Sequence, residues 1–396
     1  MFAREGQSQS GGERAILVQL DFGEPDWAER LEEVRLLTES AGGIVCAEIT
    51  GKRHSPDPRT FAGKGKAAEI LAARKDNQAE LVIFNHLLSP AQERNLERLL
   101  ECRVVDRTRL ILDIFALRAQ SAEGKLQVEL AQLEHLSTRL VRGWSHLERQ
   151  RGGIGLRGPG EKQLETDRRL LGKRVRLLKE RLERLSRQRN VQRKARQKSE
   201  TLNVSLAGYT NAGKSTLFNA LTHADVYTAN QLFATLEATS RRLWLPGTHT
   251  GNIVLSDTVG FIRDLPHALV EAFQATLEAT RDADLILHVV DSASPARDEQ
   301  IMEVDKVLAE IGAADTPQIM VWNKVDLTGV SPSIERDDCG RIRRVKLSAR
   351  AGLGLELLRS ALTEKAQEKT ARRAATALVE DEFSFKDEFS SERPAP

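Results

Sequence analysis

The 396-residue chain is poor in cysteine and has no long apolar run. Its three cysteines, Cys46, Cys102 and Cys339, are scattered and odd in number, which argues against a disulfide framework and indicates a reducing compartment. No C-x-x-C pair or histidine cluster predicts a metal site. The N-terminal residues lack the apolar core of a signal peptide, and no stretch approaches the roughly 20 apolar residues that span a bilayer. We therefore expect a cytoplasmic protein without a membrane span.

Tyrosine and tryptophan are also scarce, with two and four residues. The chain therefore offers no array of rings on which unpaired nucleic-acid bases could stack. The net charge is only +2, but residues 141–200 carry 19 Lys or Arg against 7 Asp or Glu, so the remainder of the chain is acidic. The basic run is either a solvated helical face or a surface that binds a polyanion, and composition leaves both interpretations open.

The N-terminal part reads as a small α/β subdomain. Residues 1–12 are polar and rich in Gly and Ser, which predicts disorder. Over residues 13–106, apolar runs such as Ala15–Phe22 and Cys102–Asp106 alternate with amphipathic stretches, one of which begins with Ser89 as its cap and Pro90 in its first turn. This alternation predicts a small parallel sheet with helices packed on it.

Residues 107–198 contain no convincing strand and predict two long helices. Leucines at spacings of three, four or seven form a seam in each half. The connecting segment Arg149–Glu161 has five glycines and one proline, and it cannot continue either helix. We expect an antiparallel helical hairpin with a glycine-rich tip and a second arm about 55 Å long. A parallel dimeric coiled coil is the alternative.

The strand-helix alternation resumes over residues 199–370 and predicts a domain with a doubly wound sheet. Within it, the segment "GYTNAGKS" fits the phosphate-loop pattern G-x-x-x-x-G-K-[ST] between a strand and a helix. Its candidate phosphate-binding residues are Gly208, Tyr209, Thr210, Asn211, Ala212, Gly213, Lys214 and Ser215. Backbone N–H groups and the helix dipole favour phosphate there; Lys214 can reach the β- and γ-phosphates and Ser215 can ligate Mg²⁺. The remaining residues, 371–396, are acidic and predict a disordered tail.

A second motif identifies the base as guanine rather than adenine. The Asp326 carboxylate can accept both N1–H and N2–H of guanine, and adenine has no such pair of donors. Asn323 and Lys324 would brace the loop and stack along the base, and the backbone near Ala349 would contact guanine O6. Residues 323–326 and 348–350 each follow a predicted strand, so they lie at the edge where a doubly wound sheet binds its ligand. The candidate guanine-binding residues are Asn323, Lys324, Val325, Asp326, Ser348, Ala349 and Arg350.

Two further segments predict the nucleotide-sensing switches. Asp257, Thr258, Val259 and Gly260 form a D-x-x-G motif in which Asp257 can hold Mg²⁺ through water and Gly260 can sense the γ-phosphate. The other segment contains Phe233, Ala234, Thr235 and Leu236. Thr235 is the candidate for the second hydroxyl ligand of Mg²⁺, with Thr239 a weaker one because it begins a strand. A purely structural threonine is the alternative.

Phe261 departs from the pattern of many small GTPases, which have a glutamine after D-x-x-G to orient the attacking water. Phenylalanine cannot bind water, so we expect slow intrinsic hydrolysis that a partner accelerates. Asn211 resembles the asparagine of potassium-activated GTPases, which makes K⁺ a second candidate cation.

Several longer segments resemble the HflX family of ribosome-associated GTPases. They are Thr60–Ile70, Asp106–Leu133, Arg151–Arg169, "GYTNAGKSTLFNALT" and "LFATLEAT". The resemblance implies an N-terminal α/β subdomain, a long hairpin and a GTPase domain. It implies binding to the large ribosomal subunit and GTP hydrolysis stimulated by ribosomes, and some members are ribosome-splitting or rescue factors under stress. It also implies that the hairpin tip approaches the peptidyl transferase region of 23S rRNA, with Arg149, Arg151 and Arg157 as candidate RNA contacts. Some members have a folded domain after the GTPase core, for which this chain has too few residues.

The sequence therefore predicts a monomeric, Mg²⁺-dependent GTPase of the cytoplasm, loosely associated with ribosomes or a membrane surface, that splits or rescues 70S ribosomes. A large-subunit assembly GTPase and a nucleotide-gated tether for a protein partner are the alternatives. Residues 63–66, with the sequence Gly-Lys-Gly-Lys, are either a helix-entry turn or a second RNA or nucleotide contact.

Overall fold

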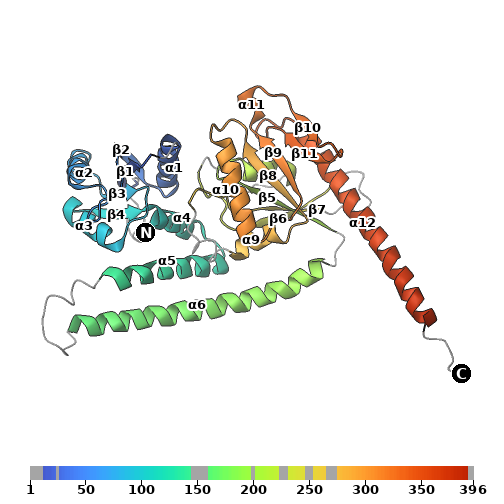
Figure 1. Cartoon of the computed structure of the whole chain (residues 1–396), viewed down its shortest axis with the longest axis horizontal. Coiled ribbons are helices and arrows are strands. Elements are labelled where there is room, and N and C mark those ends of the chain that lie inside the picture. Colours follow the sequence, from blue (N-terminus) through green and yellow to red (C-terminus); the bar gives the residue numbers. More distant parts are fainter. Residues whose placement is uncertain are drawn as a thin grey trace.

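The computed structural model describes residues 12–23, 26–143, 159–197, 201–222, 231–245, 253–264 and 274–390. Two α/β domains lie side by side, and two long helices extend below them (Figure 1). This architecture confirms the predicted fold class of an N-terminal parallel sheet, a helical region and a phosphate-loop GTPase domain. Among the described helices, none is both long and apolar enough to cross a membrane.

The N-terminal domain contains a four-stranded parallel sheet in the order β2-β1-β3-β4. Helix α3 has a capping box in which Ser89 and Gln92 satisfy each other's backbone N–H groups, as its sequence predicts. The strands are β1 (Arg14–Asp21), β2 (Ile44–Lys52), β3 (Leu81–Phe84) and β4 (Arg103–Asp106). The helices are α1 (Trp27–Ser40), α2 (Lys64–Asp76) and α3 (Pro90–Leu100).

The hairpin begins later than expected, because helix α4 (Arg107–Arg118) belongs to the N-terminal domain instead. Asp106 caps α4 by accepting a hydrogen bond from the Arg109 N–H. The residues Leu110, Ile111, Ile114 and Phe115 are buried in a core shared with α1. Apolar residues at helical spacing predict a helix but do not specify its partner, so the sequence pattern places residues 107–118 in the hairpin, whereas the structure packs them on α1.

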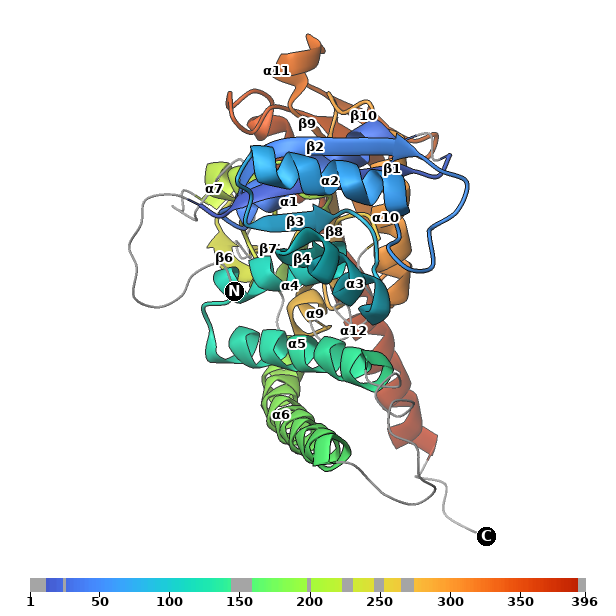
Figure 2. The same ribbon diagram turned by 90° about the vertical axis from the view of Figure 1, so that its left-hand side faces the viewer.

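The hairpin itself consists of α5 (Ala122–Gly143) and α6 (Pro159–Gln197). The two helices run in opposite directions along the molecule (Figure 1) and cross at an angle (Figure 2). Ion pairs join Arg174 to Glu129 at 2.7 Å and Lys179 to Glu134 at 2.8 Å, and Leu178 is fully buried. The contact is therefore local rather than a seam along both arms. The predicted tip lies outside the described residues.

The GTPase domain has a seven-stranded sheet in the order β10-β11-β9-β8-β5-β7-β6. The outer strands β6 and β10 are antiparallel to their neighbours, and the five inner strands are parallel. The strands are β5 (Leu202–Gly208), β6 (Thr239–Leu243), β7 (Ile253–Asp257), β8 (Leu285–Asp291), β9 (Gln318–Asn323), β10 (Ser333–Arg336) and β11 (Ile342–Lys346). The helices are α7 (Lys214–Thr222), α9 (Gln274–Arg281), α10 (Arg297–Glu310), α11 (Val325–Thr328) and α12 (Leu355–Ser390).

The last helix corrects the expectation of a disordered tail from residue 371. Helix α12 continues to Ser390 and projects away from the GTPase domain (Figure 1). Acidic composition suggested disorder, but residues 371–390 contain no Gly or Pro and are rich in Ala and Glu, which favour helix. The expected disorder of residues 1–11 lies outside the described part of the chain.

One apolar core connects the two domains. It combines side chains of α1 and α4 with GTPase residues that flank the phosphate loop, among them Leu232, Phe233, Leu236, Phe261 and Ile262. Two other cores lie within the N-terminal sheet and within the GTPase domain. The shared core fixes the N-terminal domain against the predicted switch segments.

Candidate functional site

The phosphate loop lies between β5 and α7, as its sequence predicts. Asn211 (φ +61°) and Gly213 (φ +94°) adopt left-handed backbone conformations, which orient successive N–H groups toward one concavity that suits an anion. A Cβ atom on Gly213 would lie 2.3 Å from the Asn323 side-chain nitrogen, so only glycine fits there. The loop and the guanine motif are therefore in direct contact.

Lys214 is buried beneath the loop. Its Nζ donates hydrogen bonds to the carbonyl oxygens of Gly208 at 3.0 Å and Tyr209 at 2.8 Å. Burial lowers the pKa of Lys214 to about 8, and the nearby Asp257 carboxylate acts in the opposite direction. The ammonium group thus lies at the floor of the candidate phosphate site, where phosphate oxygens would replace the two carbonyls.

The three predicted magnesium ligands converge. The Asp257 carboxylate accepts hydrogen bonds from the Ser215 hydroxyl at 2.6 Å and the Thr235 hydroxyl at 3.0 Å, and the two hydroxyls are 2.8 Å apart. Burial raises the pKa of Asp257, and the Ser215 hydrogen bond opposes this. The second carboxylate oxygen of Asp257 is buried without a hydrogen-bond partner in the described part of the chain. A compact set of oxygen donors with one unsatisfied carboxylate oxygen fits Mg²⁺. Thr239 instead begins β6.

The segment after Asp257 lies directly against the phosphate loop. The Thr258 hydroxyl donates to the Leu206 carbonyl at 2.6 Å. Thr210 N–H donates to the Phe261 carbonyl at 2.8 Å, and Phe261 N–H donates to the Gly208 carbonyl at 3.1 Å. A Cβ atom on Gly260 would lie 2.9 Å from the Thr210 Cα, so glycine permits this close approach.

The Phe261 side chain is 1% exposed and lies in the core shared by the two domains. The position that carries a water-orienting glutamine in many GTPases thus has an apolar anchor here. This burial agrees with the expectation that Phe261 takes no part in orienting water.

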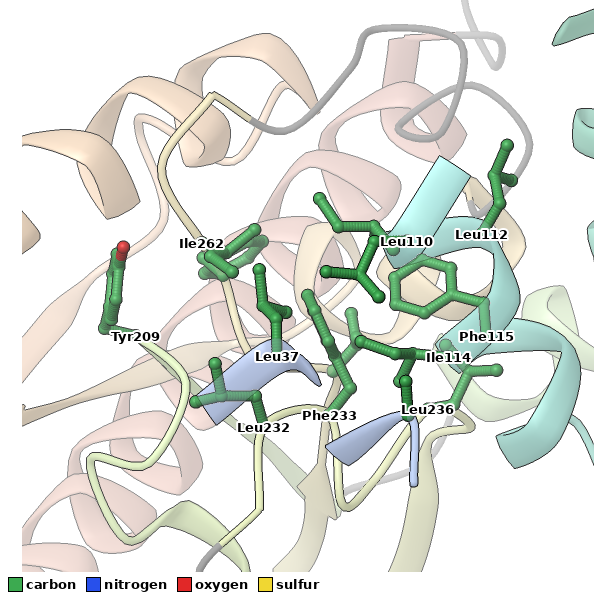
Figure 3. Close-up of a cluster of buried hydrophobic side chains, with 14 of the residues drawn as sticks. Leu37, Leu110, Leu112, Ile114, Phe115, Tyr209, Leu232, Phe233, Leu236 and Ile262 are labelled. Carbon is green, nitrogen blue, oxygen red and sulfur yellow. The ribbon is translucent and has the colours of Figure 1, made fainter. Parts of the chain in front are cut away.

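The segment containing Thr235 is held against the N-terminal domain. Phe233, Ala234 and Thr235 line the candidate nucleotide pocket, and the side chains of Phe233 and Leu236 are buried. Phe233 meets Phe115 of α4 edge to face, with ring centroids 4.7 Å apart. Figure 3 shows the apolar side chains of this segment facing those of α1 and α4, with Leu232, Phe233 and Leu236 on one side and Leu37, Leu110 and Phe115 on the other.

Polar contacts hold the same segment from both ends. The Leu232 N–H donates to the Ser40 hydroxyl at 2.8 Å, and Arg118 donates to the Gln231 side chain. The Glu237 carboxylate accepts hydrogen bonds from the Gln120 and Ser121 N–H groups, at 3.0 and 2.8 Å. The threonine proposed to bind Mg²⁺ is thus positioned by residues of the N-terminal half.

The guanine motif is organised around Asn323. Its side-chain amide donates to the Ala212 carbonyl at 2.9 Å and accepts from the Ala349 N–H at 2.9 Å. It therefore joins the phosphate loop to the loop at Ser348 and Ala349. Lys324 forms an ion pair with Asp291 at 2.7 Å.

Among the other guanine candidates, Val325 and Ser348 are buried, whereas Asp326 and Arg350 are exposed. The exposed Asp326 carboxylate lies in the first turn of α11, where it is accessible to a base.

Sequence reasoning did not identify three participants. Gln231 lines the pocket, and Glu33 and Arg107 of the N-terminal domain approach the phosphate loop through Tyr209. Tyr209, an aromatic residue with a hydroxyl group inside the phosphate loop, is the sequence feature that could have pointed to such a contact with Glu33. The candidate RNA contacts Arg149, Arg151 and Arg157 lie outside the described residues.

Comparisons with known proteins cover all three parts of the chain. Residues 28–116 match a family model described as GTP-binding GTPase N-terminal, and residues 118–196 one described as GTP-binding GTPase middle region. Residues 203–324 match a model described as 50S ribosome-binding GTPase.

Individual relatives match over most of the chain. GTPase HflX of Escherichia coli is 56% identical over 362 residues, covering 91% of this chain and 84% of the relative. GTPase HflX of Caldanaerobacter subterraneus is 48% identical over 358 residues, covering 90% of this chain and 82% of the relative. A crystal structure of SsGBP in complex with GDP has a TM-score of 0.52 and 25% identity, covering 90% of this chain and 99% of that one.

Proposed function

Because the chain belongs to the HflX family of GTPases, we propose that it uses the bound guanine nucleotide to control its attachment to the large ribosomal subunit. GTP would be bound and hydrolysed at the phosphate loop. The proposed output is the splitting or rescue of stalled or idle 70S ribosomes.

The hydrolytic site would work mainly by positioning and charge. Asp326 would select guanine by accepting its N1–H and N2–H groups, and Lys214 would neutralise the β- and γ-phosphates. Ser215, Thr235 and Asp257, the last through water, would hold Mg²⁺, which when bound stabilises negative charge on the phosphates. Gly260 N–H would face the γ-phosphate. Phe261, which directly follows the D-x-x-G motif, is buried and cannot orient water, so we expect the ribosome to supply that assistance.

The observation that carries the proposal is the attachment of both switch segments to the N-terminal domain. In the Thr235 segment, Phe233 packs on α4 and Glu237 accepts hydrogen bonds from the N–H groups that precede α5. After the D-x-x-G motif, Phe261 lies in the core shared with α1 and α4, and the Arg263 carbonyl accepts a hydrogen bond from Arg107 at 2.9 Å. A change in the position of either switch on hydrolysis would therefore move α4 and α5 relative to the GTPase domain. A helical arm that responds to the nucleotide is what a nucleotide-controlled ribosome factor requires.

The surface of α6 supports ribosomal RNA as the partner. Over residues 166–188, α6 carries nine Lys or Arg against three Asp or Glu, and most of these side chains are exposed. Lys and Arg neutralise RNA phosphates and release counterions, which gives affinity without sequence readout. A partner of this kind belongs to the cytoplasm, which is the location we propose.

GTP turnover with and without large subunits tests the proposed activity. We expect stimulation by the subunits, and we expect it to disappear when residues 151–160 are replaced by a short Gly/Ser linker. Light scattering on 70S ribosomes then separates splitting from the assembly function, because an assembly factor would leave 70S particles intact. RNase treatment separates both from a protein tether, whose contact would survive it.

Two predictions about the site stay open to direct measurement. If Asn211 helps to hold K⁺, turnover should fall when Na⁺ replaces K⁺. We also expect a monomer, which sedimentation at several protein concentrations would test.

A further inference from the structure

The Tyr209 hydroxyl joins three separate parts of the molecule. Tyr209 is the second residue of the phosphate loop, and its side chain is 6% exposed. The hydroxyl donates to the Glu33 carboxylate of α1 and accepts a hydrogen bond from the Arg263 N–H at 2.9 Å. Burial, followed by the Glu33 carboxylate, raises the pKa of Tyr209 well above its ordinary value, so the hydroxyl stays protonated and can donate.

Glu33 connects this hydroxyl to the interior of the N-terminal domain. Its carboxylate forms an ion pair with Arg107, and the two side chains are 11% and 9% exposed. Arg107 also donates to the Asn85 side chain at 2.7 Å and to the Arg263 carbonyl at 2.9 Å. Both the N–H and the carbonyl of Arg263, three residues after Gly260, are thus held by this network.

The Arg263 side chain adds further contacts to the same domain. Its guanidinium pairs with Asp26 and, at 3.4 Å, with Glu29. These residues lie at the start of α1, beyond the carboxyl end of β1, at the edge where an α/β sheet of this kind usually binds a ligand. The segment after the D-x-x-G motif occupies that edge.

The contacts continue from Arg107 to the hairpin. Arg107 adjoins Asp106, which is fully buried at the end of β4. The Asp106 and Glu93 carboxylates both pair with Arg139 of α5. The first arm of the hairpin is therefore fixed to the domain that contacts the Tyr209 hydroxyl, and we treat the two as one rigid unit.

From this geometry we infer that Tyr209 is a positioning residue whose hydroxyl makes the affinity for GTP, but not for GDP, depend on how the N-terminal domain and its hairpin are docked. The inference deepens the proposed function and rests on it for its consequence at the ribosome. It assigns to a single hydroxyl the link between the phosphate loop, the segment after Gly260 and the hairpin-bearing domain.

The selectivity for the triphosphate follows from which groups the hydroxyl holds. The α- and β-phosphates meet the backbone of the phosphate loop and Lys214, and these contacts need nothing from Arg263. A γ-phosphate would in addition face the Gly260 N–H, whose segment is anchored three residues later by the Tyr209 hydroxyl. Without this hydrogen bond, Arg107, Asp26 and Glu29 would still hold Arg263, but the segment would be less ordered, and completing its order when the triphosphate binds would cost affinity.

The test compares the affinities of the full-length protein for a non-hydrolysable GTP analogue and for GDP, in excess Mg²⁺ and without ribosomes. We expect Tyr209→Phe to lower the affinity for the GTP analogue about tenfold, which corresponds to the loss of one hydrogen bond to a charged group. The affinity for GDP should fall by less than about twofold. Glu33→Gln should act in the same direction, and the double variant should be no weaker than the worse single one. Glu48→Gln, at an ion pair with Arg35 inside the N-terminal domain, is the matched control and should leave both affinities unchanged.

An equal loss for both nucleotides, no loss for either, or an additive double variant would each overturn the inference. Thermal unfolding of Tyr209→Phe, which keeps the buried ring, shows that the variant is folded. Nucleotide-dependent attachment of the wild-type protein to large subunits is measured separately. If the wild-type protein attaches in a nucleotide-dependent manner but Tyr209→Phe retains its ratio of affinities, only the role of Tyr209 fails. If the ratio changes but attachment ignores the nucleotide, only the proposed function fails.

Discussion

Phe115→Leu tests whether the N-terminal domain holds the segment that carries Thr235. The Phe115 ring is 2% exposed and meets Phe233 edge to face at 4.7 Å. Such a pair contributes about 0.5–1.5 kcal/mol beyond the buried area, and the smaller leucine leaves a partial void. We therefore expect the docked arrangement to lose about 1–2 kcal/mol relative to a released one, a shift of about five- to thirtyfold in their populations.

The shift should be visible as faster hydrogen exchange. Amides of residues 231–238 should exchange about five- to thirtyfold faster, because exchange follows the released population. The affinity for a non-hydrolysable GTP analogue in Mg²⁺ should fall with it, since Thr235 is carried by the same segment.

Phe84→Leu provides the matched control. Phe84 is fully buried and also makes an edge-to-face contact, with Phe61 at 6.3 Å, but it lies in the separate core of the N-terminal sheet. The Phe84→Leu variant should lower the stability of the N-terminal domain without changing amide hydrogen exchange in residues 231–238. The reasoning is refuted if the two variants affect this segment equally, or if Phe115→Leu leaves it unchanged.

Three further predictions follow from other parts of the structure. Asp326→Asn should lose GTP binding and gain xanthosine triphosphate, because the new amide can donate to the C2 carbonyl of xanthine; competition binding would measure this, and unchanged GTP affinity would contradict the assignment of the base. Burial lowers the pKa of His86 from 6.5 to about 4, and its neutral ring accepts a hydrogen bond from the Leu20 N–H at 2.9 Å. The folded state therefore binds fewer protons than the unfolded state between these values, so stability should decrease as the pH falls from about 6.5 to 4. His86→Gln should flatten that decrease in thermal unfolding, and an unaltered slope would exclude His86 as its source. Finally, replacing Arg181 and Arg184 of α6 with Gln should weaken binding to the large subunit. The slope of log affinity against log salt concentration should become shallower by about 0.7–0.9 for each lost phosphate contact. The same replacement at the exposed Arg341 and Arg343 should leave both the affinity and this slope unchanged.

Local motifs made the arrangement of the candidate phosphate site predictable from the sequence. The spacing of Gly208 to Ser215 fixes the loop, and the polar residues after β7 and β9 meet it because parallel strands end at one edge of the sheet. Thr235 could be selected because a hydroxyl was needed near Ser215 and Asp257. The four-stranded N-terminal sheet followed from alternating strand and helix patterns in the same way.

The contacts between the domains could not be predicted, because periodicity identifies an apolar face without its partner. The sequence shows Phe261 only as the absence of a glutamine, whereas the structure shows its side chain buried between the domains. The Tyr209 hydroxyl bonds to a residue 176 positions away, a separation that no local pattern encodes. Helix α4 was grouped with the hairpin for the same reason, since Leu110 and Phe115 are spaced as they would be in either setting.

The most direct test of the account is the binding of the full-length protein to isolated large ribosomal subunits in three forms: without nucleotide, with GDP, and with a non-hydrolysable GTP analogue. We predict that the GTP-analogue form binds most tightly, at least about tenfold more tightly than the GDP form, which corresponds to a coupling of typical size. Equal affinity in all three forms would contradict the claim that the nucleotide controls the arm.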